Sequence, residues 1–169
     1  MSFQTVILGI DPGLVRTGWG VIACEGARLS WIAHGVIAPS PRAALADRLG
    51  ALVRGLQDVL DAYRPTEAAV EEVFMAKNAQ SALLLGHARG ATLAILSQNH
   101  VGVSEYATRR IKKALVGTGS AEKDQVAFMV RRLLPQSGSV SADAADALAA
   151  AICHAAERRS PAFTMVKSA

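Results

Sequence analysis

The chain has 169 residues, of which 51% are hydrophobic and 19% charged, and its formal net charge at pH 7 is +4. This length suits about one domain, and the composition excludes a largely disordered protein. The positive excess is only a weak indication of a polyanionic partner, because basic proteins without such a partner are equally common.

Cysteine usage and the length of the apolar runs bear on the compartment in which the protein works. Cys24 and Cys153 are too few for a disulfide framework and lack the paired spacing of a zinc site, so we expect two free thiols. The first residues do not resemble a secretion signal, and no uncharged apolar run reaches the ~18 residues of a membrane span. We therefore expect a cytoplasmic protein with no membrane contact.

The first part of the chain predicts an antiparallel meander, then a helix and a strand. Short apolar or alternating runs predict three strands, over residues 6–10, 18–23 and 29–37. Apolar residues at spacings of three and four predict an amphipathic helix over 43–63, which ends before Pro65. Residues 68–70 predict a short fourth strand, with Glu71 and Glu72 at its end.

The second part of the chain is mainly helical. The predicted helices cover residues 78–99, 108–116, 121–134 and 142–157, and a fifth strand covers 101–106. Ser120 is the expected N-cap of the third of these helices. Alternating strands and helices after a meander predict an α/β fold with a mixed five-stranded sheet flanked by helices. We expect a single domain over residues 1–158 and a flexible C-terminal tail over 159–169.

Four carboxylates stand where secondary structure could bring them together. Asp11 and Glu71 end the first and fourth strands, so they meet at one sheet edge if those strands are neighbours. Asp143 and Asp146 are three residues apart at the start of the last helix, which places them on one helix face. Flanking alanines leave room for this helix to approach another layer closely.

Each acid also has an ordinary interpretation. Asp11 is a plausible turn residue, Glu71 a plausible solvated charge, and Asp143 and Asp146 could only complement the positive helix N-terminus. Their joint placement favours a metal site instead, because clustered carboxylates repel unless cations neutralise them. Hard divalent ions prefer oxygen ligands, and two such ions can support an in-line phosphodiester displacement.

These residues belong to a wider pattern that resembles the RuvC-type Holliday junction resolvases. The matching segments are Ile-Leu-Gly-Ile-Asp-Pro-Gly at 7–13, Thr-Gly-Trp-Gly at 17–20, Glu-Glu-Val-Phe-Met-Ala-Lys-Asn at 71–78, Ser-Ala at 81–82, Leu-Gly at 85–86, Ala-Arg-Gly at 88–90, Lys112, Val-Gly at 116–117, Gly-Ser-Ala-Glu-Lys at 119–123 and Ala-Asp-Ala-Ala-Asp-Ala-Leu-Ala at 142–149. They follow in order over nearly the whole chain, and their combination is highly specific.

The resemblance implies an RNase H-like fold, a homodimer, and symmetric Mg²⁺-dependent cuts in two opposed strands of a four-way DNA junction. It places the catalytic and metal-binding acids on Asp11, Glu71, Asp143 and Asp146, with two Mg²⁺ per active site and Mn²⁺ as a substitute. It also implies a role in homologous recombination and DNA repair beside a RuvA–RuvB branch-migration complex.

Basic and aromatic residues near the acids are the candidate DNA contacts. A basic run follows the fifth strand and contains Arg109, Arg110, Lys112 and Lys113, which could otherwise be a solvated helix face. The resemblance favours Lys112, together with Lys123 in the first turn of the next helix, where backbone N–H groups also favour a phosphate. It further implies that Phe74, otherwise a plausible core residue, projects toward the junction, where a ring can stack on a base.

The helix predicted over 78–99 is apolar on more than one face, which indicates either deep burial or a partner helix. The resemblance implies that it forms the dimer interface. Three other functions compete with a resolvase: a kinase or actin-like ATPase, another RNase H-like nuclease or transposase, and a non-catalytic junction-binding module.

Overall fold

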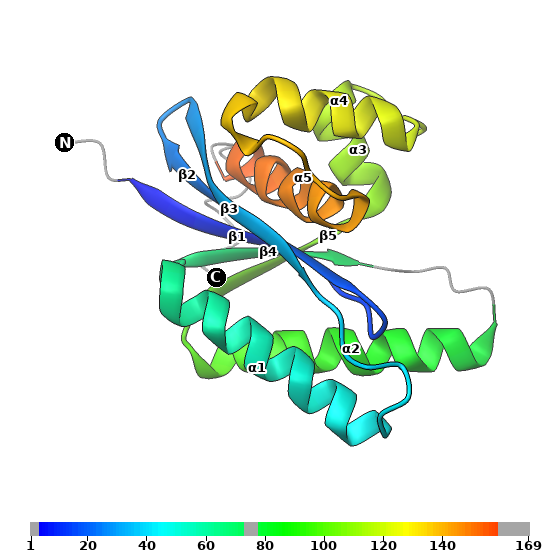
Figure 1. The fold of residues 1–169 in the computed structure, drawn as a ribbon. Coiled ribbons are helices and arrows are strands. Elements are labelled where there is room, and N and C mark those ends of the chain that lie inside the picture. Colours follow the sequence, from blue (N-terminus) through cyan, green and yellow to red (C-terminus); the bar gives the residue numbers. More distant parts are fainter. Residues whose placement is uncertain (1–3, 73–77, 159–169) are drawn as a thin grey trace, which may run out of the picture.

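The computed structural model describes residues 4–72 and 78–158, which fold around one mixed sheet (Figure 1). The five strands lie in the order β3-β2-β1-β4-β5. Their bounds are β1 Thr5–Asp11, β2 Thr17–Glu25, β3 Arg28–Ile37, β4 Glu67–Glu72 and β5 Gly102–Ala107. The first three are antiparallel neighbours, while β4 is parallel to both β1 and β5. The predicted meander and five-stranded mixed sheet are confirmed.

Helices cover both faces of this sheet. Their bounds are α1 Leu45–Tyr63, α2 Ala79–Gln98, α3 Thr108–Val116, α4 Lys123–Leu133 and α5 Ala142–Glu157, with a short 3-10 helix at Pro135–Ser137. Figure 1 shows α1 and α2 below the sheet and α3, α4 and α5 above it. Alternate residues of β1 serve the two layers, since Leu8 packs toward α1 and α2 and Ile7 packs toward α5.

Local signals explain several helix ends. Helix α1 ends at Arg64, which has a left-handed backbone and precedes Pro65, and α3 ends at Gly117 with φ 91°. The predicted N-cap at Ser120 is wrong, because α4 begins two residues later than that cap requires. Glu122 caps α4 instead, through a reciprocal capping box with Gln125.

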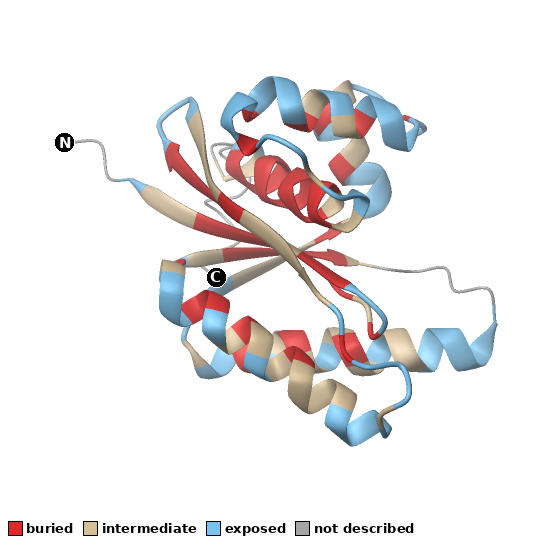
Figure 2. Cartoon of the chain, viewed as in Figure 1, coloured by how far each residue is buried: buried red, intermediate tan, exposed pale blue. Residues whose placement is uncertain are grey.

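Helix α5 lies unusually close to β1 and β2, and Figure 2 shows it buried along most of its length. A Cβ atom on Gly9 would lie 1.9 Å from the carbonyl oxygen of Ala147, and one on Gly18 would lie 1.9 Å from that of Asp143. Only glycine fits at these two contacts. The glycines therefore fix the first turns of α5 directly over the ends of β1 and β2.

The structure also bears on the predictions about the cysteines and about membrane spans. Cys24 and Cys153 are both buried and neither forms a disulfide, as predicted. Within residues 4–72 and 78–158, no helix combines the length and apolar character needed to cross a bilayer. The predicted tail at 159–169 lies outside the described residues.

Candidate functional site

The strand order brings Asp11 and Glu71 to the same edge of the sheet. Asp11 is the last residue of β1, and Glu71 is the last but one of β4. The two strands are parallel neighbours with Ile10 opposite Val70, so the acid that follows each of these residues lies beside the other. The site therefore forms where the chain leaves two adjacent parallel strands.

Helix α5 adds its two acids to this edge. Asp143 and Asp146 lie in its first turns, beginning after the N-cap Ser141, whose hydroxyl accepts from the Ala144 N–H at 3.4 Å. The contact between Gly18 and Asp143 holds this end of the helix over β2. The structure thus gathers all four predicted acids in one corner of the molecule.

The electrostatics show how crowded these carboxylates are. Burial, followed by the negative charges of Glu71, Asp146 and Asp143, raises the pKa of Asp11 to about 8. Burial also raises the pKa of Glu71, against the opposing effect of the hydrogen bond that Thr108 Oγ1 donates to Glu71 Oε1. Burial and the neighbouring acids therefore favour the neutral form of both carboxyl groups unless a cation binds beside them.

Two cations approach the acids of α5. Lys123 Nζ lies 3.3 Å from Asp146 Oδ2, and the charge of Asp146 raises the pKa of this lysine. Arg16 Nε lies 2.6 Å from Asp143 Oδ2. Each of these basic side chains therefore faces one acid of the last helix.

A cavity of about 250 Å³ opens between the acids and the neighbouring helices. Its polar lining comprises Asp11, Glu71, Asp146, Thr108, Lys112 and Lys123. Its apolar walls come from α3, α4 and α5. A lining that combines three carboxylates with two lysines suits a cation together with a phosphate.

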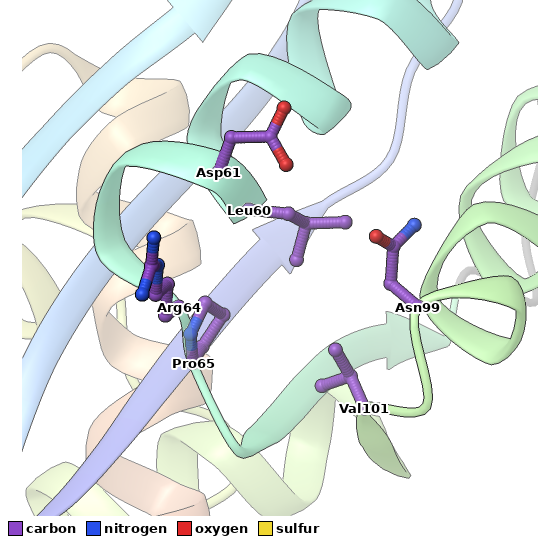
Figure 3. A pocket seen from close by; sticks show the side chains of 6 residues that line it. All are labelled: Leu60, Asp61, Arg64, Pro65, Asn99 and Val101. Carbon is purple, nitrogen blue, oxygen red and sulfur yellow. The ribbon is translucent and has the colours of Figure 1, made fainter.

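A larger hollow, of about 380 Å³, lies elsewhere, where α1 and α2 end (Figure 3). It is lined by Leu60, Asp61, Arg64, Pro65, Asn99 and Val101. Two of its polar side chains are already paired within the chain, because Gln57 donates to Asp61 at 2.8 Å and exchanges hydrogen bonds with Asn99. We therefore assign no chemistry to it.

The predicted DNA contacts fall into two groups. Lys112 and Lys123 line the cavity beside the acids. Arg109 and Lys113 lie on the same helix as Lys112 but do not line the cavity. Phe74 lies outside the described residues, so its position relative to the site stays a prediction.

Sequence reasoning missed two residues of this corner. Thr108, immediately after β5, binds Glu71, and Arg16, in the loop between β1 and β2, binds Asp143. A hydroxyl just beyond the strand adjacent to β4 was a usable signal for Thr108. A lone basic residue five positions after Asp11 was the corresponding signal for Arg16.

The donor chemistry of the site fits a hard divalent cation. Its candidate ligands are carboxylate oxygens, and within residues 4–72 and 78–158 no histidine or cysteine lines the cavity. Among the residues that the structure describes, no group of three or more acidic, histidine or cysteine side chains is already arranged around a single ion position. The acids are near one another, and two of them are occupied by Arg16 and Lys123.

Fold and site together define a class of protein: an α/β protein with carboxylates clustered at the ends of parallel strands, beside lysines that can take a phosphate. The family profile described as Crossover junction endodeoxyribonuclease RuvC matches residues 7–154. A relative of that name from Caulobacter vibrioides is 58% identical over 151 residues, which cover 89% of each chain. The chain therefore belongs to the RuvC family of crossover junction endodeoxyribonucleases.

Solved structures agree with this assignment. The Thermus thermophilus RuvC structure matches with a TM-score of 0.83 and 36% identity, covering 92% of this chain and 96% of that one. The structure of T. thermophilus RuvC in complex with Holliday junction substrate also has a TM-score of 0.83, at 37% identity, covering 89% of this chain and 93% of that one. The family resemblance and the RNase H-like fold predicted from the motifs are both confirmed.

Proposed function

We propose that this chain resolves Holliday junctions by hydrolysing one phosphodiester in each of two opposed strands, during homologous recombination and DNA repair. Its membership of a family of crossover junction endodeoxyribonucleases supports the reaction and the substrate. The observation that carries the proposal is the meeting of Asp11, Glu71, Asp143 and Asp146 beside two lysines. Acids alone would repel a DNA phosphate, whereas acids that share a cavity with lysines can admit one.

The four acids would be the catalytic residues and would hold two Mg²⁺ ions, with Mn²⁺ able to substitute. Such ions activate a water and stabilise the leaving oxygen of an in-line displacement. Asp11 and Glu71 are oriented by the sheet, and Asp143 and Asp146 by the first turns of α5. Four ionised carboxylates would match the charge of two divalent cations, whereas without cations burial and then the neighbouring acids raise the pKa of Asp11 to about 8.

Five residues are the proposed DNA contacts. Lys112 and Lys123 would bind phosphates next to the acids, and Arg109 and Lys113 would extend this basic surface along α3. Phe74 would stack on a base at the junction, so Phe74→Ala should retain binding and lose cleavage.

The proposed homodimer would use α2. Leu83 on this helix is 62% exposed, and Cβ atoms on Gly86 and Gly90 would meet no atom of the described residues within 4 Å apart from the backbone of their own helix. An exposed leucine beside open glycines allows a second helix to approach closely. Two active sites related by a twofold axis suit two equivalent strands. This dimer would work in the cytoplasm beside a RuvA–RuvB motor. Each chain would form one domain over residues 1–158.

The test is cleavage of a synthetic four-way junction with a mobile core, beside a linear duplex and an RNA–DNA hybrid. We expect paired symmetric nicks in the junction alone, with Mg²⁺ or Mn²⁺ but not Ca²⁺, leaving 5′-phosphates. Glu71→Gln should abolish them. The matched control is Glu72→Gln, because Glu72 is the adjacent residue of β4 and does not line the cavity.

Each other outcome identifies a different function. Cutting of the RNA–DNA hybrid alone would support the catalytic acids, but it would identify the hybrid and not the junction as the substrate. Tight junction binding that is insensitive to all four acids, with no cutting, would identify a binding module. Equal loss in Glu71→Gln and Glu72→Gln would contradict the assignment of Glu71.

A further inference from the structure

The loop between β1 and β2 is held in a single shape next to the acids. The Gly13 N–H donates to Thr17 Oγ1 at 3.0 Å, and the Thr17 hydroxyl donates back to the Gly13 carbonyl at 2.6 Å. Arg48 Nη2, from α1, donates to the Leu14 carbonyl at 3.0 Å. The first two hydrogen bonds join the two ends of the loop, and the third connects the loop to α1.

The tip of this loop points outward. Val15 is 65% exposed, and the Arg16 side chain is 50% exposed, although Leu14 and Thr17 on either side are buried. Gly18 then packs against the backbone of Asp143, which brings the loop beside the first turn of α5. A rigid loop therefore presents an exposed arginine at the edge of the carboxylate cluster.

The ion pair of Arg16 differs from the other arginine pairs. Arg110 binds Glu157 through both Nε and Nη2, at 2.9 and 2.8 Å, and Arg158 binds Glu67 through the same two nitrogens. Arg16 reaches Asp143 through Nε, and this is its single hydrogen bond within the described part of the chain. Its terminal nitrogens remain available for a second anion, and a guanidinium fork suits a phosphate.

We propose that Arg16 exchanges partners: it neutralises Asp143 in the free protein and binds a phosphate of the junction once Asp143 turns to a divalent cation. The proposal rests on the proposed function, since it takes Asp143 as a metal ligand. Arg16 and Asp143 do not line the cavity that holds Lys112 and Lys123. The Arg16 loop joins β1 to β2, whereas the lysines lie on α3 and α4, which follow β5 at the other edge of the sheet, so Arg16 would contact the DNA backbone on the other side of the acids.

The exchange predicts opposite effects of one substitution in two assays. Arg16→Ala should bind Mn²⁺ without DNA about 1.5- to fivefold more tightly, because an exposed ion pair no longer competes for Asp143. The same variant should bind a four-way junction in Ca²⁺ more weakly. Its plot of log affinity against log salt should be less steep by about 0.9 for each phosphate that the protein no longer neutralises.

Two further variants separate this exchange from a loss of folding. Arg16→Lys keeps the charge and should restore the salt slope. Arg54→Ala removes one exposed arginine from α1, on the opposite face of the sheet, and should change neither titration. Calorimetric Mn²⁺ titration and junction binding at several salt concentrations measure both effects.

The results decide between the alternatives. A salt slope in Arg16→Ala equal to that of the wild type would overturn the phosphate contact. Unchanged or weaker Mn²⁺ binding would overturn the competition for Asp143, and weakening in both assays would indicate a merely structural arginine. If the wild-type protein itself does not bind the junction, the proposed function fails with the phosphate contact, while the DNA-free Mn²⁺ titration still decides the competition.

Discussion

The two ends of α5 lie over the two ends of β4, and the carboxylates at these ends have opposite surroundings. At the C-terminal end of the helix, Glu67 at the start of β4 contacts His154 at 2.7 Å and accepts two hydrogen bonds from Arg158, at 2.9 and 3.0 Å. At the N-terminal end, Glu71 and Asp11 share a corner with two more acids. The same helix and strand thus carry a neutralised carboxylate at one end and a charged cluster at the other.

The pKa shifts of the carboxyl groups at the two ends of α5 have opposite directions. Burial alone would raise the pKa of Glu67, but hydrogen bonds from Arg158 and His154 lower it below its ordinary value. Burial raises the pKa of Asp11 to about 8, and the neighbouring acids add to the rise. A carboxylate whose charge is matched within the chain anchors the fold, whereas unmatched charge needs a cation from outside.

The largest expected effect comes from neutralising the acidic end. Asp11→Asn should lower junction cleavage in Mg²⁺ by more than the ~10- to 100-fold that loss of an outer-shell partner costs a metal site. The same variant should raise the melting temperature in EDTA, because folding no longer has to protonate a carboxyl group whose ordinary pKa is 3.8. Cleavage and thermal unfolding test this, with Asp124→Asn on the exposed side of α4 as the control. Cleavage by Asp11→Asn at the wild-type rate would contradict the catalytic role of Asp11.

The opposite end should respond in the opposite way. Glu67→Gln leaves Arg158 and buried His154 without their carboxylate, so it should lower the free energy of unfolding by about 1–3 kcal/mol. Cleavage at a temperature where the protein is folded should stay within about twofold, because Glu67 lies at the far end of β4 from Glu71. Denaturant unfolding measures the loss, and Glu25→Gln in the exposed hairpin is the comparison. A stability equal to wild type would remove the anchoring role.

A smaller effect is expected where the chain supports the acidic end. Thr108→Val removes the hydroxyl that donates to Glu71, and it should reduce cleavage about tenfold through a less well positioned carboxylate. Thr108→Ser keeps the donor and should retain most of the activity. The Mg²⁺ dependence of cleavage gives the readout that a structural role would not change. Equal activity in the valine and serine variants would contradict the positioning role.

The last expected effect is a pH dependence of stability without metal. The folded-state pKa of Asp11, about 8, lies above its ordinary 3.8, so the folded protein binds more protons than the unfolded chain between these values. Stability in EDTA should therefore fall as pH rises through this window and level off above about 8. Melting temperatures at a series of pH values measure this, at ~2–4 °C per kcal/mol. The fall should be weaker in Asp11→Asn, and an equal fall there would assign it to other groups.

Sequence reasoning predicted the elements of the fold because their signals are local. Apolar runs and spacings indicated each strand and helix, and the acids stood at positions that depend only on where those elements end. Once β1 and β4 are parallel neighbours, Asp11 and Glu71 must lie side by side. The sequence also shows the basic run after β5, but not that its members have different partners. Arg110 binds Glu157 near the end of α5, while Lys112 lines the cavity beside the acids.

By itself, the sequence determined the family, the order of the elements and the four candidate acids, because these depend on residue identity and short-range pattern. Only the tertiary structure decided which charges are matched. Arg16 and Asp143 are 127 residues apart, and Glu67 and Arg158 are 91 apart. Such pairs depend on sheet register and on how closely α5 approaches the glycines of β1 and β2, which no local signal contains.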